Sequence, residues 1–356
     1  MRRPLVLAAA ALFVLAPALP AWAEPEVPED GTQGLDYPRG GQGPEGSKIA
    51  FEFQDPRISE SSGLAPSLRH EGVWWTHNDS GDHPSHVYAV NEEGETIATV
   101  TLNVERRDWE AISLAQGPEG EPAVFVGDIG DNFGGGWPSV RVFHFAEPEV
   151  LGDMVLDPAV LTFTYADGGR DAEGMMIDPR DGRLYVVSKE FAGGVYAAPE
   201  TLDPHGENTL NRIDSAPLFA TDAAFSADGT RYAIRTYWGV TLYDSTDGVP
   251  GTSVGAFDLP ETDQGESVAF TPDGTALMAG SEGAHSPVWW VPLEGAQLPE
   301  HAAGEAPEES SSAAEEEEEE AAVAEEEGAG GIPLILLGAG IAGLLIAGIT
   351  WLARRG

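Results

Sequence analysis

The segment most informative about the fold spans residues 170–190 and reads RDAEGMMIDPRDGRLYVVSKE. An apolar run leads into Asp181-Gly182, and a β-branched and aromatic run returns from it. This pattern predicts a β-hairpin, because glycine readily adopts the positive φ that a tight turn needs. The two strands would be antiparallel, so Glu173 at the start of the first strand and Lys189 after the second should lie on the same side of the hairpin.

The same hairpin pattern occurs five times along the chain. An acidic residue stands at the start of each candidate first strand, and the five acids are Glu60, Glu110, Glu173, Asp222 and Glu266. Their spacings are 50, 63, 49 and 44 residues, and repeats of about this length with four strands each are typical of a β-propeller. We therefore predict an all-β fold, a β-propeller of four-stranded blades. Five repeats are visible, and the long second repeat leaves room for a sixth blade.

The outer strands are predicted from short apolar and β-branched runs after each hairpin. Third strands are expected at residues 86–90, 140–145, 195–198, 240–243 and 288–291, and fourth strands at 96–102, 161–165 and 256–259. The last repeat lacks a fourth strand, whereas a lone alternating strand, residues 48–53, precedes the first repeat. We expect this strand to complete the last blade and close the ring, because closure removes the exposed edges of a sheet.

The chain outside the predicted propeller divides into segments of distinct composition. Residues 1–23 have a basic start, an apolar centre and an A-x-A end, as a signal peptide does. Residues 332–353 are uncharged and, at about 1.5 Å per residue, long enough to cross a bilayer as a helix. The predicted order is a signal peptide (1–23), a disordered linker rich in Pro, Gly and Glu (24–47), the β-propeller (48–298), an acidic low-complexity stalk (299–331), a transmembrane helix (332–353) and a cytoplasmic tail (354–356).

The basic residues at the C-terminal end give an expected location. Arg354 and Arg355 follow the apolar segment directly and should stay in the cytoplasm. We therefore expect a single-pass protein of the cell membrane. Its C-terminal helix would make the membrane contact, and its propeller would be extracellular.

The composition excludes one class of partner and two classes of site. The formal net charge is −42, and only 12 of the negative charges are the glutamates of residues 301–330. Such a surface repels nucleic acids, so we expect no nucleic-acid partner. The chain contains no cysteine, which excludes disulfides and thiolate metal sites.

Polar residues should gather on one face of the predicted propeller. The first strands line the central channel, and their starts lie at the same end as the residues that follow the second strands. The starts carry Glu60, Glu110, Glu173, Asp222 and Glu266. The residues at the ends of the second strands are Asn78, Asp79, Asp128, Asp131, Asn132, Lys189, Glu190, Arg235 and Glu282.

The five acids at one end of the channel indicate a candidate site. Clustered carboxylates repel one another, so several must be protonated, paired with Lys189 or Arg235, or bound to a cation. Calcium takes six to eight oxygen ligands, so we predict that the five acids bind a metal, with calcium as the candidate, and that the second set of residues binds a ligand. The alternative is structural, because an acid at a strand start also hydrogen-bonds backbone amides and fixes a blade.

Short motifs resemble those of known propeller families. Secreted bacterial propellers described as WD40-repeat-like have similar runs to Ser62-Gly63, HNDSG at 77–81, Asp108-Trp109-Glu110 and GDIGDN at 127–132. DAEG at 171–174 and Gly265-Glu266-Ser267 look like strand starts of the esterase-like phytase family, and the Glu-Gly strand starts of gluconolactonase-type propellers are similar. The resemblance to phytases implies that Glu110, Glu173 and Glu266 bind calcium and that Lys189 contacts phosphate.

Three functions are consistent with this sequence. The first is a membrane-anchored extracellular propeller that binds a small-molecule or protein ligand, together with a divalent cation, on its acidic central face. The second is a calcium-dependent phosphoester or ester hydrolase of the esterase-like phytase type, in which the carboxylates hold the metal. The third is a structural interaction module of the cell envelope. The sequence does not decide whether the protein is an enzyme.

Overall fold

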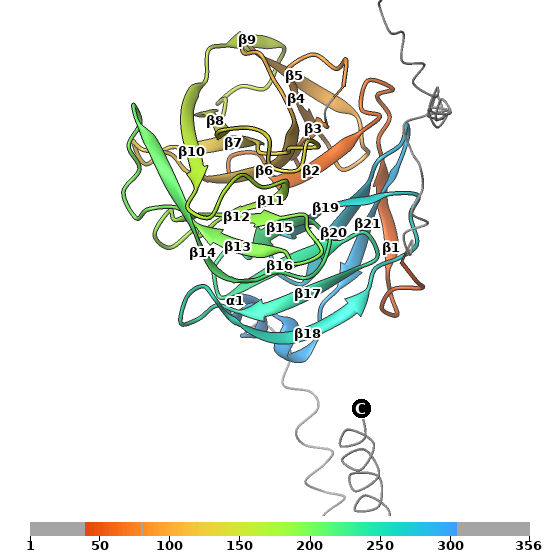
Figure 1. Ribbon diagram of the computed structural model, residues 1–356. Coiled ribbons are helices and arrows are strands. Elements are labelled where there is room, and N and C mark those ends of the chain that lie inside the picture. Colours follow the sequence, from red (N-terminus) through yellow and green to blue (C-terminus); the bar gives the residue numbers. More distant parts are fainter. Residues whose placement is uncertain (1–39, 80, 305–356) are drawn as a thin grey trace, which may run out of the picture. The chain divides into compact units, whose positions relative to one another are not determined.

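The computed structural model describes residues 40–79 and 81–304. Within these ranges the regular structure is β-strand apart from two short helical turns, η1 (Gly295–Gln297) and α1 (Glu300–Ala303). The strands form five blades around a central channel, so the fold is an all-β propeller (Figure 1). The predicted signal peptide, transmembrane helix and cytoplasmic tail lie outside the described residues, as do most of the predicted linker and stalk.

Each blade is an antiparallel sheet of four strands. Blade 1 contains β2 (Ser61–Pro66), β3 (Trp74–Asn78), β4 (His86–Val90) and β5 (Thr96–Leu102). Blade 2 contains β6 (Trp109–Gln116), β7 (Pro122–Asp128), β8 (Val140–Ala146) and β10 (Ala159–Tyr165). Blade 3 contains β11 (Ala172–Ile177), β12 (Leu184–Ser188), β13 (Gly194–Ala197) and β14 (Glu207–Ser215). Blade 4 contains β15 (Ala220–Phe225), β16 (Arg231–Thr236), β17 (Gly239–Asp244) and β18 (Thr252–Asp258). Blade 5 contains β19 (Gly265–Phe270), β20 (Ala276–Ser281), β21 (Pro287–Pro292) and β1 (Lys48–Glu52).

Strand β1 closes the ring, as the sequence predicts. It pairs antiparallel with β21, from Lys48 opposite Trp290 to Glu52 opposite Pro287. The aromatic rings of Phe51 and Phe53 are buried in a cluster of side chains from blades 1 and 5. The first strand of the described chain therefore supplies both the fourth strand of the last blade and part of the core that joins it to blade 1.

The long second repeat does not contain a sixth blade. Its extra residues form β9 (Met154–Leu156), a strand of three residues that pairs parallel with β5 and so extends the sheet of blade 1. Strand β10 pairs parallel with β14, which joins the outer edges of blades 2 and 3. Strand β14, the fourth strand of blade 3, is absent from the sequence prediction. Buried and exposed residues alternate only in the first half of β14, so its sequence shows a weak strand pattern.

The five first strands, β2, β6, β11, β15 and β19, contact one another in sequence around the channel. All six residues of β11 and of β19 are buried. A strand that is covered on both faces has a nearly continuous run of small and apolar residues instead of an alternating one. Neighbouring strands approach closely: a Cβ at Gly63 of β2 would lie 2.8 Å from the amide nitrogen of Ile112 in β6.

The predicted hairpin turns are confirmed. Gly182, Gly229 and Gly274 have φ values of 75°, 72° and 71°, which is the left-handed region that these Asp-Gly turns require. The C-terminal turn α1 packs on blade 4, where the amide of His301 donates to Asp228 Oδ2 at 3.0 Å. No helix among the described residues is long and apolar enough to cross a membrane.

Candidate functional site

The starts of the first strands lie at the same end of the channel as the ends of the second strands. In blade 2, for example, Trp109 at the start of β6 is opposite Asp128 at the end of β7. In blade 3, Ala172 is opposite Ser188 in the same way. We call this end the acidic face, and it comprises the side chains of Asp79, Asp108, Glu110, Asp171, Glu173, Lys189, Glu266 and Glu282.

A register shift, typical of a β-bulge, occurs at the start of all five first strands. The shifted residues include Glu110, Glu173 and Glu266, whereas blades 1 and 4 have Ser62 and Thr221 at this place. Bulges commonly re-aim a side chain next to a functional site. The hydroxyls of Ser62 and Thr221 donate to the backbone carbonyls of Glu110 and Glu266, both at 2.9 Å. Three of the five predicted acids therefore occupy equivalent positions.

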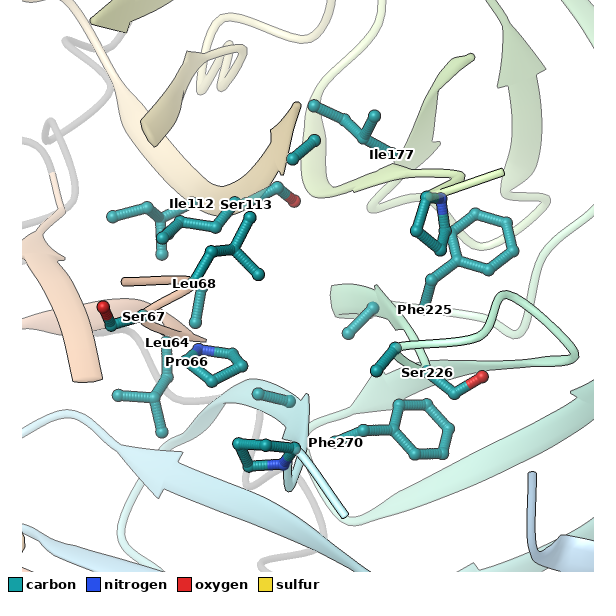
Figure 2. A pocket seen from close by; sticks show the side chains of 18 of the residues that line it. Leu64, Pro66, Ser67, Leu68, Ile112, Ser113, Ile177, Phe225, Ser226 and Phe270 are labelled. Atoms are coloured by element: carbon teal, nitrogen blue, oxygen red, sulfur yellow. The ribbon is translucent and has the colours of Figure 1, made fainter. Parts of the chain in front are cut away.

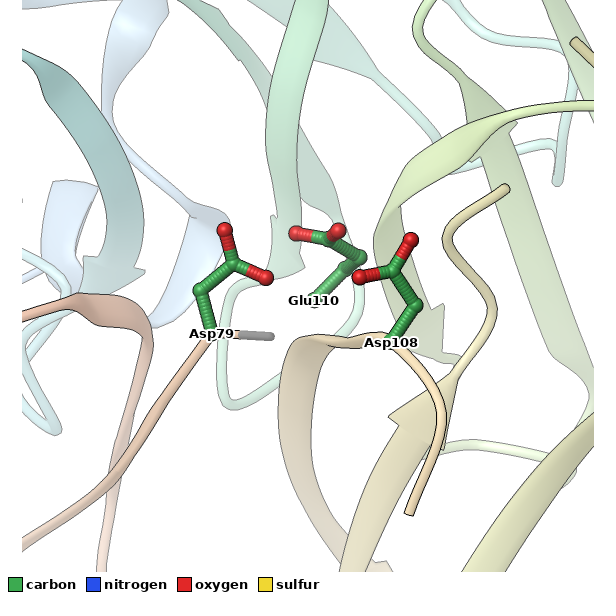
Figure 3. A group of neighbouring side chains, drawn as sticks. All are labelled: Asp79, Asp108 and Glu110. Atoms are coloured by element: carbon green, nitrogen blue, oxygen red, sulfur yellow. The ribbon is translucent and has the colours of Figure 1, made fainter. Parts of the chain in front are cut away.

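Asp79, Asp108 and Glu110 form the tightest carboxylate group of the acidic face, which we call the carboxylate trio. Each offers an oxygen atom, and these atoms lie within 4.8 Å of one another (Figure 3). Asp79 follows β3, while Asp108 and Glu110 flank Trp109, whose ring is fully buried. Asp108 precedes β6 and Glu110 lies at its register shift, so the bulge, and not the regular alternation of a strand, sets the directions of these two side chains. A Cβ at Gly130 would lie 2.5 Å from Glu110 Oε1, so the chain passes close to the trio at this glycine.

Lys189 is a cation of the acidic face. Its Nζ forms an ion pair with Glu173 Oε1, and it lies 5.1 Å from the centre of the Tyr237 ring. Burial lowers the pKa of Lys189, but the carboxylates of Glu173 and Glu266 outweigh this effect and hold its pKa above the usual range. Lys189 is therefore protonated and neutralises one side of the face.

The carboxyl groups of the acidic face hold protons more tightly than ordinary glutamates. Burial raises the pKa of Glu110 and of Glu173 well above the usual value, and in both cases neighbouring carboxylates add to the effect. Burial raises the pKa of Glu266 to about 7, although Lys189 acts in the opposite direction. Burial and the charge of Glu266 raise the pKa of Glu282 to about 9. Without further positive charge, several of these groups are protonated at neutral pH.

Two of the predicted metal ligands lie outside the trio and have other contacts. Glu60 Oε2 lies 2.7 Å from His83 Nε2, and the side chain of Glu60 is 44% exposed. Asp222 accepts hydrogen bonds from the amides of Ala223 and Val268, both at 2.7 Å, and so joins β15 to β19. These are the contacts expected of an acid that hydrogen-bonds backbone amides and fixes a blade. Metal binding by Glu60 and Asp222 stays a prediction.

Arg235 is fully buried at the end of β16. Its Nη1 donates to the carbonyl of Ser267 at 2.5 Å. Burial lowers the pKa of Arg235 to about 10, and the nearby carboxylates of Glu266 and Asp222 oppose that shift. The guanidinium therefore stays charged and compensates two acids of blades 4 and 5, which leaves its role in ligand binding a prediction.

Several predicted ligand-binding residues hold loops in place. Asn78 Oδ1 accepts hydrogen bonds from the amides of Ser59 and Glu60 at 3.1 and 3.0 Å. Asp128 is buried and pairs with the guanidinium groups of Arg107 and Arg141. These contacts fix the loops that carry the trio, because Asp128 also accepts from the amide of Asp108 at 2.8 Å.

The remaining predicted residues lie around the acidic face. The Asp131 carboxylate accepts from the amides of Phe133 and Trp137 at 3.1 and 2.6 Å, as in an Asx turn. Asn132 Nδ2 donates to Asp108 Oδ2 at 3.2 Å, so it contacts the trio. Glu190 pairs with Arg170 at 3.2 Å, beside the loop that carries Lys189.

The similarity of the chain to known proteins lies in solved structures of low sequence identity. No protein-family model matches the chain, and no curated protein matches it either. Among solved structures, a gluconolactonase from Xanthomonas campestris is similar over 70% of this chain and 89% of its own, with 12% identity and a TM-score of 0.43. The β-propeller domain of Cps50 (Swd1) from Myceliophteria thermophila is similar over 69% and 100%, with 12% identity and a TM-score of 0.39. The RRP9 WD40 repeats are similar over 66% and 67%, with 16% identity and a TM-score of 0.37.

Two residues of the acidic face, Asp108 and Asp171, and two beside it, Gln264 and Tyr237, are missing from the sequence prediction. Asp171 accepts a hydrogen bond from the amide of Asp131 at 2.8 Å. Asp108 contributes to the trio, and its place two residues before Glu110 is the signal that could have identified it. Gln264 Nε2 donates to Glu266 Oε1 at 2.9 Å. Tyr237, just after β16, lies beside Lys189. Neither Gln264 nor Tyr237 has a sequence signal, because both are placed by contacts between blades.

The raised pKa values predict that the domain loses stability as the pH rises from 7 to 9 in a chelating buffer. The folded-state pKa values of Glu266 and Glu282, about 7 and about 9, exceed that of an unfolded glutamate, near 4.3. The stabilising contribution of these protons is complete below the unfolded value and is lost as the pH passes the folded values. The measurement is the melting temperature at pH 7 to 9, above the range in which His77, with a pKa lowered to about 4, acts in the opposite direction.

The double variant Glu266→Gln with Glu282→Gln is the comparison for this pH series. It cannot lose these protons, so its melting temperature should fall less between pH 7 and pH 9 than that of the wild type. Equal slopes for the two proteins would contradict the raised pKa values.

Proposed function

We propose that the protein binds a ligand together with a divalent cation on the acidic face, and that residues 332–353 anchor it with this domain outside the membrane. The observation that supports a cation site is the trio, in which Asp79, Asp108 and Glu110 place oxygens within 4.8 Å of one another. Carboxylate oxygens are preferred ligands of calcium, which takes six to eight of them. The trio therefore fits calcium and leaves coordination positions for oxygens of a ligand.

The electrostatics of the face support the same proposal. Burial and the neighbouring carboxylates raise the pKa of Glu110, although the charge of Lys189 acts in the opposite direction. Lys189 pairs with Glu173, and the guanidinium of Arg106 interacts with Asp79 and Asp108, but these charges do not bring the pKa of Glu110 back to its usual value. A cation bound at the trio would replace the proton of Glu110. It would supply the charge that holds an anionic or hydroxyl-bearing ligand at the mouth of the channel.

The proposal is tested by thermal unfolding of the full chain in calcium and in chelator. Calcium at a hundredfold excess over its dissociation constant should stabilise the wild type by about 2.7 kcal/mol. In Glu110→Gln this gain should shrink, because one ligand charge is lost. Without a cation site, Glu110→Gln would change the stability by the same amount in both buffers.

The control variant is Glu92→Gln. Glu92 is an exposed acid in the turn between β4 and β5, and it belongs neither to the acidic face nor to the predicted metal ligands. The gain from calcium should therefore be preserved in this variant. A wild type that melts at the same temperature in chelator and in millimolar calcium would remove the cation from the proposal.

The hydrolase alternative uses the same coordination positions, so the same samples distinguish it from a binding module. Turnover of a model phosphoester or lactone that requires calcium and disappears in Glu110→Gln would make the protein an enzyme. Stabilisation by calcium without such turnover would mean that the protein binds calcium but does not hydrolyse these substrates, as expected of a ligand-binding module.

A further inference from the structure

A cavity lies at the end of the channel opposite the acidic face. Its volume is 320 Å³, and the last residues of all five first strands and the turns after them form its wall (Figure 2). In β6 the wall begins at Ile112, two residues after Glu110 of the trio, and extends to Gln116, and neither a residue of the trio nor Lys189 lines the cavity. The cavity is therefore separate from the proposed cation site.

The wall of this cavity is mainly apolar. Leu64, Ile112, Ile177 and Phe270 contribute to it, and all four are buried by the protein. Leu68 also lines the cavity and is 48% exposed (Figure 2). Apolar side chains that line a concave site favour ligands that replace the water in it.

Three hydroxyl groups of the wall donate hydrogen bonds to other groups of the protein. Ser113 Oγ donates to the carbonyl of Met175 at 2.8 Å. Ser226 Oγ donates to Asp228 Oδ1 at 2.7 Å, and Thr271 Oγ1 donates to Asp273 Oδ1 at 2.6 Å. A charged or strongly polar ligand would give up its hydrogen bonds to water and regain few here, which is unfavourable. The cavity therefore selects for uncharged ligands.

We propose that this cavity binds an uncharged, mainly apolar small molecule with the size of a two-ring aromatic compound. An engineered cavity of about 150 Å³ lined by Leu, Ile and Phe holds benzene, and this cavity is roughly twice as large. A folded partner does not fit, because five strands enclose a space of only 320 Å³. Water alone is a poor occupant, since ordered water needs two to four polar partners.

The test is photolabelling of the full chain with benzophenone, an uncharged two-ring ketone that inserts into nearby C–H bonds on irradiation. Peptide mapping by mass spectrometry should place the adducts in residues 64–68, 112–116 and 269–272, and excess naphthalene should suppress them. Labelling of residues 332–353 reports only partition into detergent and is read separately, because it occurs on other peptides.

Two matched variants make the test specific. Leu68→Glu places a charge at the mouth of the cavity and removes apolar contact, so labelling of the three segments should fall about tenfold, or about 1.4 kcal/mol in binding. Ile97 on β5 is similar in size to Leu68 and is 39% exposed, but it does not line the cavity. Ile97→Glu should therefore leave the labelling unchanged. Equal labelling of both variants, adducts spread over exposed aromatics such as Phe191, or no suppression by naphthalene would overturn the proposal.

Discussion

Deletion of residues 48–53 should abolish the cooperative unfolding of the domain. The deletion removes β1 and with it the fourth strand of blade 5, which exposes the hydrogen-bonding edge of β21. It also removes Phe51 and Phe53, which are 6% and 0% exposed. Loss of a buried phenylalanine side chain typically costs about 3–5 kcal/mol. Two such losses are comparable with the whole stability of a domain, about 5–15 kcal/mol. The measurement is thermal unfolding by circular dichroism, with size-exclusion chromatography to detect aggregation.

Two point variants separate the packing of β1 from the presence of the strand. Phe53→Ala should reduce the free energy of unfolding by about 3–5 kcal/mol while the domain still unfolds cooperatively. Ile49→Ser changes a side chain that is 46% exposed and should have little effect. A deletion variant that melts as the wild type does would show that β1 contributes nothing to closure.

Lys189→Met should be the most destabilising single substitution on the acidic face. The variant removes the partner of Glu173, a side chain with only 6% exposure, and so leaves a buried carboxylate without its counter-charge. Breaking a buried ion pair in this way typically costs about 3–5 kcal/mol. The cost should be smaller at pH 5 than at pH 8, because a Glu173 of raised pKa is more fully protonated at the lower pH. Denaturant unfolding at the two pH values measures both effects.

The design includes a compensating variant and a matched control. The double variant Lys189→Met with Glu173→Gln has no unpaired charge, so it should regain most of the lost stability. Arg170→Met breaks the pairs with Glu190 and Asp167, whose side chains are 30% and 38% exposed, and should cost less than Lys189→Met because both acids can be solvated by water. Equal losses in the free energy of unfolding for Lys189→Met and Arg170→Met would mean that the buried Lys189–Glu173 pair contributes no more than the more exposed pairs of Arg170.

The blades could be predicted from the sequence because their signals are local. Each Asp-Gly turn requires only the conformation of a glycine, and Gly182, Gly229 and Gly274 adopt it. The alternating residues 48–53 read as a strand without a partner, and the last repeat lacked one strand. Closure by β1 followed from those two facts. The short β9 and the weakly alternating β14 were missed, because pairing with neighbouring strands decides them.

The composition of the acidic face, in contrast, was decided by tertiary structure. The sequence presents five acids at similar places, but the register shifts put Glu110, Glu173 and Glu266 in equivalent positions and place Ser62 and Thr221 in the other two. Asp79 meets Asp108 and Glu110 only because blades 1 and 2 pack side by side. Turn chemistry and apolar periodicity are properties of a few neighbouring residues. A register shift of one residue, and the meeting of side chains from different blades, depend on the packing of all five first strands around the channel.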